Sequence, residues 1–515
     1  MAKSKLTRWE PEEQSFWEET GKGVALRNLV ISVPCLLLAF AVWSYWSIIT
    51  VQMKNLGFVF TAQQLFTLTA VAGLTGATLR IPNSFLIAIA GGRNVIALTT
   101  AFLLIPAVGT GIALQDKNTP FGTFVILAAL SGFGGGNFAS SMSNINPFFP
   151  KRMQGAALGV NAGLGNVGVS LMQIVLPWAM TLSLFGALGG AGLALPAAVG
   201  MKPAGTLVWI QNCGLFWVPI LAVLAVAAWV GMNNLPSQNF GSVPLAIGKI
   251  IGLHLIGFAG AAIGLWLLLA KNVNMWIALP VTIVVTLLFM KMVPGGVATA
   301  LNKQFAIFRE KHTWLMTWLY VMTFGSFIGY SAAFPLLIKV IFGTHADGTV
   351  NPHAPNPFAY AWLGPLVGSL VRPVGGWLSD KLSGARVTQW STAVMIAAAL
   401  GVAHYVKLAA QAAAPEDYFL PFLGFFLVLF TMTGIGNGST FRMIPMIFER
   451  EMAGPVLGWT SAIGAYGAFI IPRVFGAQIA ARHAEYALYG FAAYYVSCLA
   501  VNWFYYARKN AEKPC

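Results

Sequence analysis

The sequence predicts an all-α integral membrane protein that crosses the membrane fourteen times. Apolar residues make up 57% of its 515 positions and charged residues only 9%, whereas soluble domains carry about 25% charged residues. Apolar stretches of roughly 20 residues, the length that a helix needs to cross a bilayer, recur along the whole chain. Lysine and arginine gather in alternate connections between these stretches, which is typical of a multi-pass membrane protein.

The apolar stretches form two groups of six with a pair between them. We expect an arm with an interfacial helix (1–26), an N-terminal six-helix bundle (27–235), a two-helix insert with a cytoplasmic linker (236–311), a C-terminal six-helix bundle (312–508) and a cytoplasmic tail (509–515). The predicted spans are 28–51, 64–90, 94–114, 121–145, 154–185, 207–232, 245–270, 274–293, 313–341, 358–379, 386–411, 418–440, 453–481 and 486–507.

The basic residues predict the orientation of the chain. They crowd the arm, the tail and every second connection, including Lys151, Arg450 and the stretch 291–311. Because cytoplasmic loops carry the excess of lysine and arginine, both termini are predicted to be cytoplasmic. The net charge of +15 does not indicate nucleic-acid binding, since the basic residues lie between apolar stretches and not in one patch.

Cysteine and histidine do not indicate an enzyme. The four cysteines and six histidines show no disulfide or metal-ligand spacing, and no nucleophile has an adjacent base. We therefore expect no cofactor, no metal and no catalytic activity.

The two halves repeat. Gly76 precedes Arg80 by four residues in the second span, and Gly368 precedes Arg372 by four in the matching span of the second half. Arg372 follows Arg80 by 292 positions, and Gly464 follows Gly165 by 299. Internal repeats of this kind are typical of secondary transporters with a binding site at mid-membrane, between the repeats.

Arg80 and Arg372 are the candidate substrate-binding residues. Each lies well inside an apolar stretch, where a charge is costly, and no acidic residue lies near it in the sequence. Two buried cations without internal counter-ions need an anion, and the planar guanidinium with its paired donors suits a planar oxyanion. The alternative, that both side chains extend to the lipid headgroups, is disfavoured by their distance from the ends of the stretches.

Aromatic and amide side chains are expected around the two arginines. Such walls suit a weakly hydrated ion, whereas a phosphate ester would recruit further lysine or histidine. By helix position these neighbours are Asn137, Phe138, Asn166, Tyr320 and Phe324.

Two glycine-rich stretches, 158–171 and 458–469, stand in the fifth span of each half. Glycine costs about 1 kcal/mol against alanine in a helix interior, so these residues must allow another backbone or a ligand to approach closely. We expect them to let helices slide as one half tilts. They are Gly159, Gly163, Gly165 and Gly168 in the first stretch and Gly464 and Gly467 in the second.

The segment 375–386, GGWLSDKLSGAR, resembles the cytoplasmic loop motif of the major facilitator superfamily. In that family the motif joins the second and third helices of a half, as it does here in the C-terminal half. The resemblance implies the superfamily fold of two six-helix bundles, here with two extra helices between them, and a gating role for Asp380 and Arg386. The N-terminal counterpart, 91–93, lacks the aspartate.

Further stretches resemble the bacterial nitrate/nitrite porter family, specifically its nitrate/nitrite exchangers. The resemblance covers nearly the whole chain, and the two glycine-rich stretches match that family's nitrate signature motifs. The quoted stretches are SVPCLLLAFAVW, LTAVAGLTGATLRIPNSF, GGGNFASSMSNINPFFPKRMQGAALGVNAGLGNVGVS, YVMTFGSFIGYSAAF and SAIGAYGAFIIPRVFG.

This resemblance implies a site in which Arg80 and Arg372 clamp the anion. Asn166, Tyr320 and Phe138 would complete the site, and Phe324 would pack against it. It also implies nitrate and nitrite as substrates, exchange by alternating access, and a monomer in the bacterial cytoplasmic (inner) membrane. The insert at 245–293 departs from the twelve helices of the usual member.

Alternatives remain open at this point. A nitrate/proton symporter would have to use His254, His404 or another group, because no carboxylate lies inside an apolar span. An exchanger of another small anion, or an anion channel, could use the same arginines, although the repeat and the loop motif favour a carrier. A fourteen-span drug/proton exchanger ought to show an acidic residue in an early span, and none is present.

Overall fold

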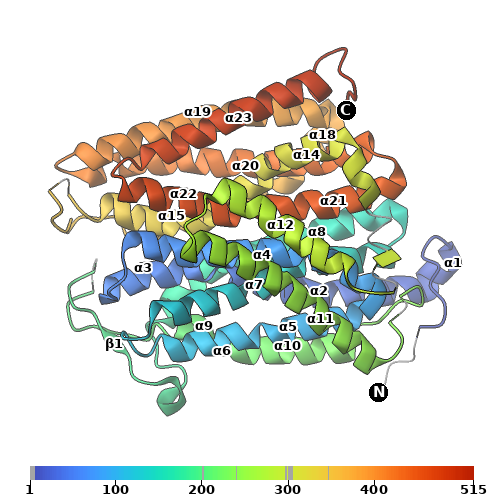
Figure 1. Cartoon of the computed structure of the whole chain (residues 1–515), viewed down its shortest axis with the longest axis horizontal. Helices are drawn as coiled ribbons and strands as arrows, with labels where there is room; N and C mark the ends of the chain where they lie inside the picture. Colours follow the sequence, from blue (N-terminus) through green and yellow to red (C-terminus); the bar gives the residue numbers. More distant parts are fainter. Residues whose placement is uncertain (1–5, 200–201, 239, 296–297, 300–304, 346) are drawn as a thin grey trace.

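The computed structural model describes residues 6–199, 202–238, 240–295, 298–299, 305–345 and 347–515. Two groups of helices run side by side: the N-terminal group (blue to green) lies lower in Figure 1, and the C-terminal group (yellow to red) lies above it. Helix α1 (Gln14–Phe16) and the C-terminal segment lie at the same end of the bundle. Lys303 and the side chains of Lys151 and Arg450, used above to predict orientation, lie outside the described part.

Twelve helices in the described residues are long and apolar enough to cross a membrane. Two of the fourteen predicted spans are not among them. The predicted span 274–293 corresponds to α12 (Met275–Lys291), which has only 17 residues. The predicted span 358–379 is divided among three short helices. The last break falls before Arg372, where Pro373 cannot donate a backbone hydrogen bond to the preceding turn.

The N-terminal half surrounds α4, the helix that carries Arg80. The Thr61 side chain and Gln64 form a capping box that begins α4, and Gly91 ends it with a φ of +83°. Its helices are η1 (Trp17–Gly21), α2 (Lys22–Ser44), α3 (Trp46–Leu56), α4 (Ala62–Ala90), α5 (Gly92–Phe102), α6 (Leu104–Ala113), α7 (Phe121–Ile145), η2 (Asn146–Phe148), α8 (Lys151–Ala179), α9 (Asn212–Leu215) and α10 (Trp217–Gly231).

A long connection without an α-helix separates α8 from α9. The predicted span 154–185 ends early, at Ala179, because the Asn212 side chain takes up the carbonyl groups of Ala179 and Leu182. The connection holds η3 (Gly186–Gly189) and a short antiparallel pair, β1 (Leu193–Ala194) with β2 (Leu207–Val208).

The described part of the N-terminal arm packs on the protein. The Trp9 indole donates to the Pro147 carbonyl at 3.0 Å, and the Trp17 ring lies 5.9 Å from that of Phe149. Helical structure begins at Gln14 and continues to Leu56, interrupted only at Tyr45 between α2 and α3. A position of this arm on the lipid surface stays a prediction.

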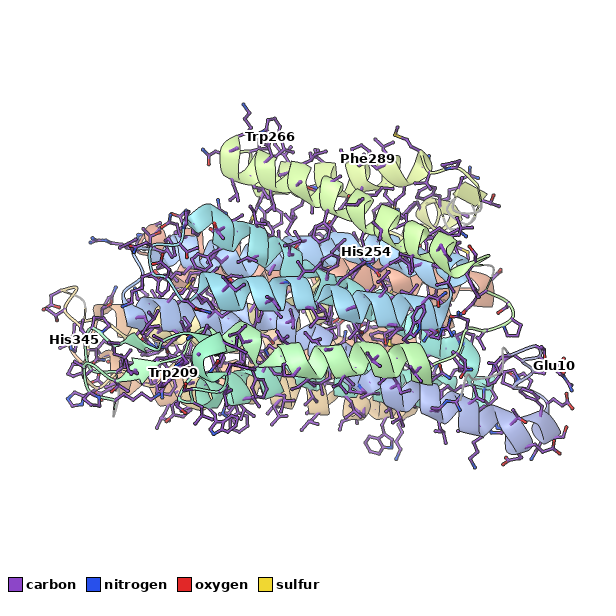
Figure 2. All side chains as sticks on the ribbon, turned by 90° about the horizontal axis from the view of Figure 1, so that it is seen from below. Glu10, Trp209, His254, Trp266, Phe289 and His345 are labelled. Carbon is purple, nitrogen blue, oxygen red and sulfur yellow. The ribbon has the colours of Figure 1, made fainter. Side chains whose placement is uncertain are left out.

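The insert consists of α11 (Val243–Leu265), η4 (Trp266–Ala270) and α12, and it lies across one face of the bundle (Figures 1 and 2). Its packing is directed at α4. A Cβ on Gly257 would lie 2.6 Å from the Leu79 side chain, and the Lys249 ammonium donates to the Ile89 carbonyl at 2.9 Å. The insert therefore touches the helix that carries Arg80.

The C-terminal half is a helical bundle like the N-terminal half. Its core is a run of aromatic rings on α15 and α20, with Phe334 stacked on Phe426 at 4.3 Å. Its helices are η5 (Phe305–Arg309), α14 (Lys311–Tyr320), η6 (Val321–Gly325), α15 (Ser326–Phe342), α16 (Pro357–Tyr360), α17 (Leu363–Leu370), α18 (Arg372–Leu382), α19 (Gly384–Gln411), η7 (Pro415–Tyr418), α20 (Phe419–Ile447), α21 (Arg450–Gly464), α22 (Gly467–Ala480), α23 (Glu485–Asn502) and η8 (Trp503–Ala507).

Candidate substrate site between the two halves

Arg80 lies in the middle of α4 and is fully buried, at 0% exposure. Its Nε donates to the Gly135 carbonyl of α7 at 2.9 Å, and its Nη1 donates to the carbonyl and hydroxyl of Ser461 on α21 at 3.2 and 3.1 Å. Its Nη2 has no partner among the described residues. The guanidinium thus joins the two halves and keeps one nitrogen free to donate.

Arg372 begins α18 and is 9% exposed. The break before α18 places this residue at a helix start, where backbone N–H groups are not used by the helix. Both Nε and Nη2 of Arg372 are buried and without a partner among the described residues. The side chain therefore carries more unused donors than Arg80.

Aromatic rings surround both guanidinium groups. The carbon Cζ of Arg80 lies 4.7 Å from the centre of the Phe138 ring and 5.0 Å from that of Phe324. The same carbon of Arg372 lies 5.7 Å from Phe324 and 4.3 Å from Phe327. Phe324 touches both arginines, so one ring links them, and ring faces partly replace the water that burial removes from a cation.

Tyr320 and Asn166 contribute polar groups at the same depth. The Tyr320 hydroxyl lies within electrostatic range of both guanidinium groups and is buried without a hydrogen-bond partner among the described residues. Asn166 is buried, with its Nδ2 on the Ala162 carbonyl and its Oδ1 unpartnered. No described contact joins Asn166 to either arginine.

The described carboxylates lie away from this site. Ion pairs with carboxylates occur at the arm, the tail and loops, but none of those found among the described residues involves Arg80 or Arg372.

The six signature glycines have different surroundings. A Cβ on Gly168 would lie 2.1 Å from the Leu37 carbonyl oxygen, and one on Gly467 would lie 2.1 Å from that of Gly325. Gly165 abuts the Leu36 side chain, and Gly464 abuts the Tyr320 ring at 2.8 Å. A Cβ on Gly159 or Gly163 would meet nothing within 4 Å. Close approach thus explains four of these glycines in this conformation and leaves those two without such a contact.

Asp380 pairs with Arg442 of α20, a residue that the sequence analysis did not single out. Both side chains are about half exposed. The backbone N–H of Arg386 donates to the Ser383 hydroxyl at the start of α19. The loop motif thus joins α18 to α20 within one half, which no local sequence pattern indicates.

The two halves are joined at one end and parted at the other. Near the start of α4, Arg473 of α22 donates to the Thr67 hydroxyl at 3.0 Å, and farther along the Thr78 and Tyr466 hydroxyls lie 2.9 Å apart. Beyond Arg80, towards the end of α4, a cavity of about 270 Å³ is lined by residues of both halves, of the linker and of the insert. Its lining includes Ser84, Phe85, Asn146, Leu287, Phe305, Phe308, Gly458 and Trp459.

The two histidines considered for proton coupling lie elsewhere. His254 of the insert is buried, with its Nδ1 at 2.8 Å from the Ile250 carbonyl and its Nε2 at 3.3 Å from Asn83. Figure 2 shows it on the side of α11 that faces the bundle. His404 is exposed on α19. Neither has a described contact with the two arginines.

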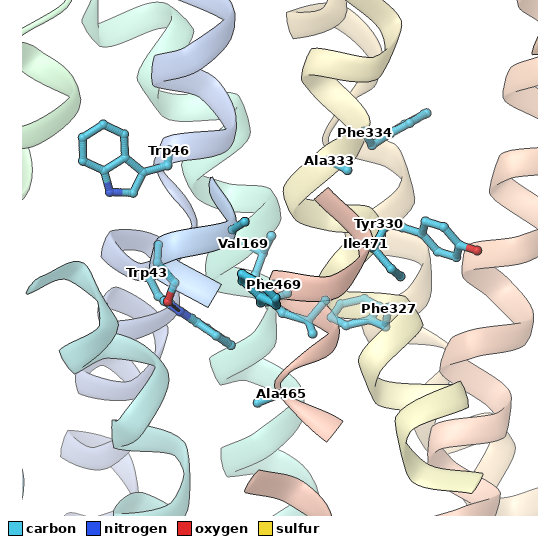
Figure 3. Close-up of a cluster of buried hydrophobic side chains, with 14 of the residues drawn as sticks. Trp43, Trp46, Val169, Phe327, Tyr330, Ala333, Phe334, Ala465, Phe469 and Ile471 are labelled. Carbon is cyan, nitrogen blue, oxygen red and sulfur yellow. Dashed lines mark hydrogen bonds between the residues drawn. The ribbon is translucent and has the colours of Figure 1, made fainter. Parts of the chain in front are cut away.

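Four residues that contact the two arginines were not predicted from the sequence. Trp43 lies 5.3 Å from Arg80, and Gly135, Ser461 and Phe327 contact the arginines as described above. Figure 3 shows Trp43 and Phe327 on opposite sides of Phe469. A signal existed for Phe327 alone, since it follows Tyr320 and Phe324 at helical spacing.

Two helical halves related by an internal repeat, with a pair of buried arginines between them, define a secondary transporter of the major facilitator superfamily fold. The chain superposes on a bacterial homolog of the human lysosomal transporter Spinster with a TM-score of 0.59 and 13% identity, over 94% of this chain and 96% of that one. It superposes on a peptide transporter POT in complex with sulfate with a TM-score of 0.55 and 12% identity, over 93% and 97%. At such identities the likeness shows the fold alone.

Sequence relatives show the family. The chain is 38% identical to the probable nitrate/nitrite antiporter NarK2 of Thermus thermophilus (99% of this chain, 98% of that protein) and 37% identical to the nitrate/nitrite transporter NarU of Escherichia coli (98% and 96%). It is 36% identical to NarU of Salmonella typhimurium (99% and 97%). No family model matches the chain. The chain belongs to the nitrate/nitrite porter family, a family of multi-pass membrane transporters and not of enzymes.

Proposed function

We propose that this protein exchanges nitrate for nitrite across the bacterial cytoplasmic membrane by alternating access. The observation that carries the proposal is the pair Arg80 and Arg372, buried between the halves and linked by one ring, Phe324. The names of the relatives, nitrate/nitrite antiporter and nitrate/nitrite transporter, support the choice of anion.

The anion would lie between the two guanidinium groups. The unpartnered Nη2 of Arg80 and the Nε and Nη2 of Arg372 are charged donors for a planar oxyanion. The Tyr320 hydroxyl would add a further donor, and Asn166 would approach when the halves move. Phe138 and Phe324 would hold the flat ion between ring faces, which suits weakly hydrated anions better than phosphate.

Exchange follows from the charge of the site. An unloaded site holds two like charges in a medium of low dielectric constant, and a monoanion offsets their repulsion. Closing the cavity over the unloaded site would remove the remaining water from both cations, which is costly. Reorientation should therefore require a bound anion, and the carrier would then exchange one anion for another.

Symport of nitrate with a proton is the second candidate. It requires a titratable group coupled to the site, and the buried candidate is His254, which lies on the insert against Asn83. Exchange of another small anion is a third candidate, because the guanidinium pair alone does not select nitrate.

Topology is also proposed. We expect α12 and the broken segment α16–α18 to cross the membrane, which gives fourteen crossings with both termini in the cytoplasm. The cavity beyond Arg80 would then open to the cytoplasm, and the chain would act as a monomer. Asp380 with Arg442 would gate the cytoplasmic side of the C-terminal half, with Arg386 at the same loop.

Counterflow in proteoliposomes tests the proposal. Vesicles preloaded with nitrite should take up labelled nitrate far faster than vesicles without an internal anion, and chloride or phosphate inside should not substitute. Equal rates with and without internal nitrite would contradict exchange. Uptake driven by an imposed pH gradient would favour the symporter instead.

A further inference from the structure

We infer that Asn437 of α20 contacts the transported oxyanion directly and supplies an amide donor beside Arg372 and Tyr320. This inference rests on the proposed function, and it adds a residue that the sequence analysis did not name. Asn437 is 1% exposed, and its Nδ2 has no hydrogen-bond partner among the described residues. An unsatisfied buried amide donor is costly, so it requires a ligand or a functional reason.

The packing of α20 fixes the direction of this side chain. The backbone at Gly434 and Gly438 abuts the helix of Arg372, since a Cβ on Gly438 would lie 2.3 Å from the Arg372 carbonyl oxygen. The backbone at Gly436 faces Thr323 on η6. With 3.6 residues per turn, position 437 falls between these two faces. Its amide therefore points into the space between the helix of Arg372 and the helix of Tyr320.

Contacts one turn further along α20 support this direction. The Phe441 ring packs edge-on against the Tyr320 ring at 5.4 Å, and the Thr440 hydroxyl lies 3.2 Å from that of Thr323. Asn437 and the Tyr320 hydroxyl are close neighbours, although they do not reach the distance of a full hydrogen bond. The Tyr320 hydroxyl and the Asn437 amide thus converge on one space without a full hydrogen bond to a described residue, as donors around an anion would.

The internal repeat gives an independent argument. Asn437 follows Phe138 by 299 positions, the same offset that relates Gly464 to Gly165. Phe138 lies on the Arg80 guanidinium in the first half. On this offset Asn437 would take the corresponding place beside Arg372, with an amide in place of the ring. The site would be asymmetric, with a ring wall on one side and a hydrogen-bond donor on the other.

Three variants test the inference by counterflow and by thermal unfolding of the purified protein. Asn437→Leu keeps the shape without the donor, and we expect it to raise the KM for nitrate and nitrite about tenfold with a smaller change in kcat. Asn437→Ser keeps a donor and should recover part of that loss. Asn437→Asp places a carboxylate beside the guanidinium groups, so exchange should be lost while the unfolding temperature rises.

Ser439→Ala is the matched control, because the Ser439 hydroxyl on the same helix bonds to Thr388 and the Gly436 carbonyl. It should leave the KM unchanged. An unchanged KM in Asn437→Leu would overturn the inference. If Asn437→Leu fails to fold, full exchange by Asn437→Asp would overturn it equally. A wild-type protein that exchanges no nitrate or nitrite would instead defeat the proposed function.

Discussion

At the scale of single residues, the site satisfies two buried cations in different ways. Arg80 donates three hydrogen bonds to protein groups, namely the Gly135 carbonyl and the carbonyl and hydroxyl of Ser461. Arg372 instead meets ring faces, with Phe327 at 4.3 Å, and keeps two nitrogens unbonded. In the proposed site, Arg80 would therefore be the fixed side and Arg372 the side with the most donors for a ligand.

Arg372→Lys should lower the affinity for nitrate by about tenfold or more. A lysine keeps the charge but not the paired planar donors, and its ammonium is more strongly hydrated. The KM in nitrite-loaded proteoliposomes measures the effect. Arg93→Lys is the control, because Arg93 lies over Trp229 outside the site. Equal KM values for Arg372→Lys and wild type would show that charge alone holds the anion.

At the scale of elements, the signature glycines have two kinds of surroundings. Gly168 and Gly467 bring backbones together, α8 against α2 and α22 against η6. Gly163, one and a half turns before Gly168, faces open space in this conformation. The same sequence motif thus combines positions of close approach with positions that have room for a side chain.

Gly467→Ala should destabilise the protein and stop exchange, whereas Gly163→Ala should fold at least as well as wild type. An added Cβ at Gly467 would lie 2.1 Å from the Gly325 carbonyl oxygen, but one at Gly163 would meet nothing within 4 Å. Alanine also favours a helix over glycine by about 1 kcal/mol. Thermal unfolding compares the two variants. Reduced exchange by a stable Gly163→Ala would show that this position closes on another helix in the other conformation.

The insert is an element whose packing defines its role. Its described contacts with Leu79, Asn83 and Ile89 follow α4 on both sides of the Arg80 level. His254 belongs to this contact, between Asn83 and the rings of Phe102 and Phe133. The insert therefore supports α4, and we expect it to move with the N-terminal half.

His254→Leu should reduce the stability of the protein by about 1–3 kcal/mol, because Asn83 loses a buried partner. It should not change the pH dependence of exchange, since packing and not proton transfer explains the position of His254. Nitrate uptake at several external pH values, with unfolding measured on the same samples, separates the two effects. Loss of a pH-driven component in the variant would support the symporter.

At the scale of the whole molecule, the halves meet near the start of α4 and part near its end. Hydrogen bonds cross between them at Thr67 and Thr78, and the cavity lies on the other side of Arg80. The described hydrogen bonds between the halves and the cavity thus lie on opposite sides of Arg80.

A disulfide across the cavity should stop exchange. A Cβ on Gly458 would lie 4.0 Å from the Cβ of Ser84, which is within the range of disulfide bonds. With the four native cysteines replaced, oxidised Ser84→Cys with Gly458→Cys should hold the halves together, and a reducing agent should restore activity. The same double variant kept reduced is the control and should transport. Transport by the oxidised Ser84–Gly458 pair would contradict motion of one half against the other.

Local chemistry in the sequence was enough to predict the class, the repeat and the central residues. An arginine in an apolar stretch is costly wherever that stretch lies in the bundle, so Arg80 and Arg372 stood out before any contact was known. Family membership confirmed the resemblance that the glycine-rich stretches carried. The number of crossings was harder to predict, because hydropathy does not show that a proline divides the segment of Arg372 into short helices.

Contacts between distant segments were decided by the tertiary structure alone. Ser461 bonds to Arg80 across 381 positions, and Asp380 reaches Arg442 across 62, so no local pattern could pair them. The role inferred for Asn437 could not be predicted either, since the sequence does not show whether the amide of a buried asparagine has a hydrogen-bond partner. Sequence alone determined which charged groups need a partner inside the membrane, because the cost of burying them depends on residue type and depth. The tertiary structure decided which groups contact these charges, because hydrogen bonds and ring contacts depend on distances that only the packing of the helices sets.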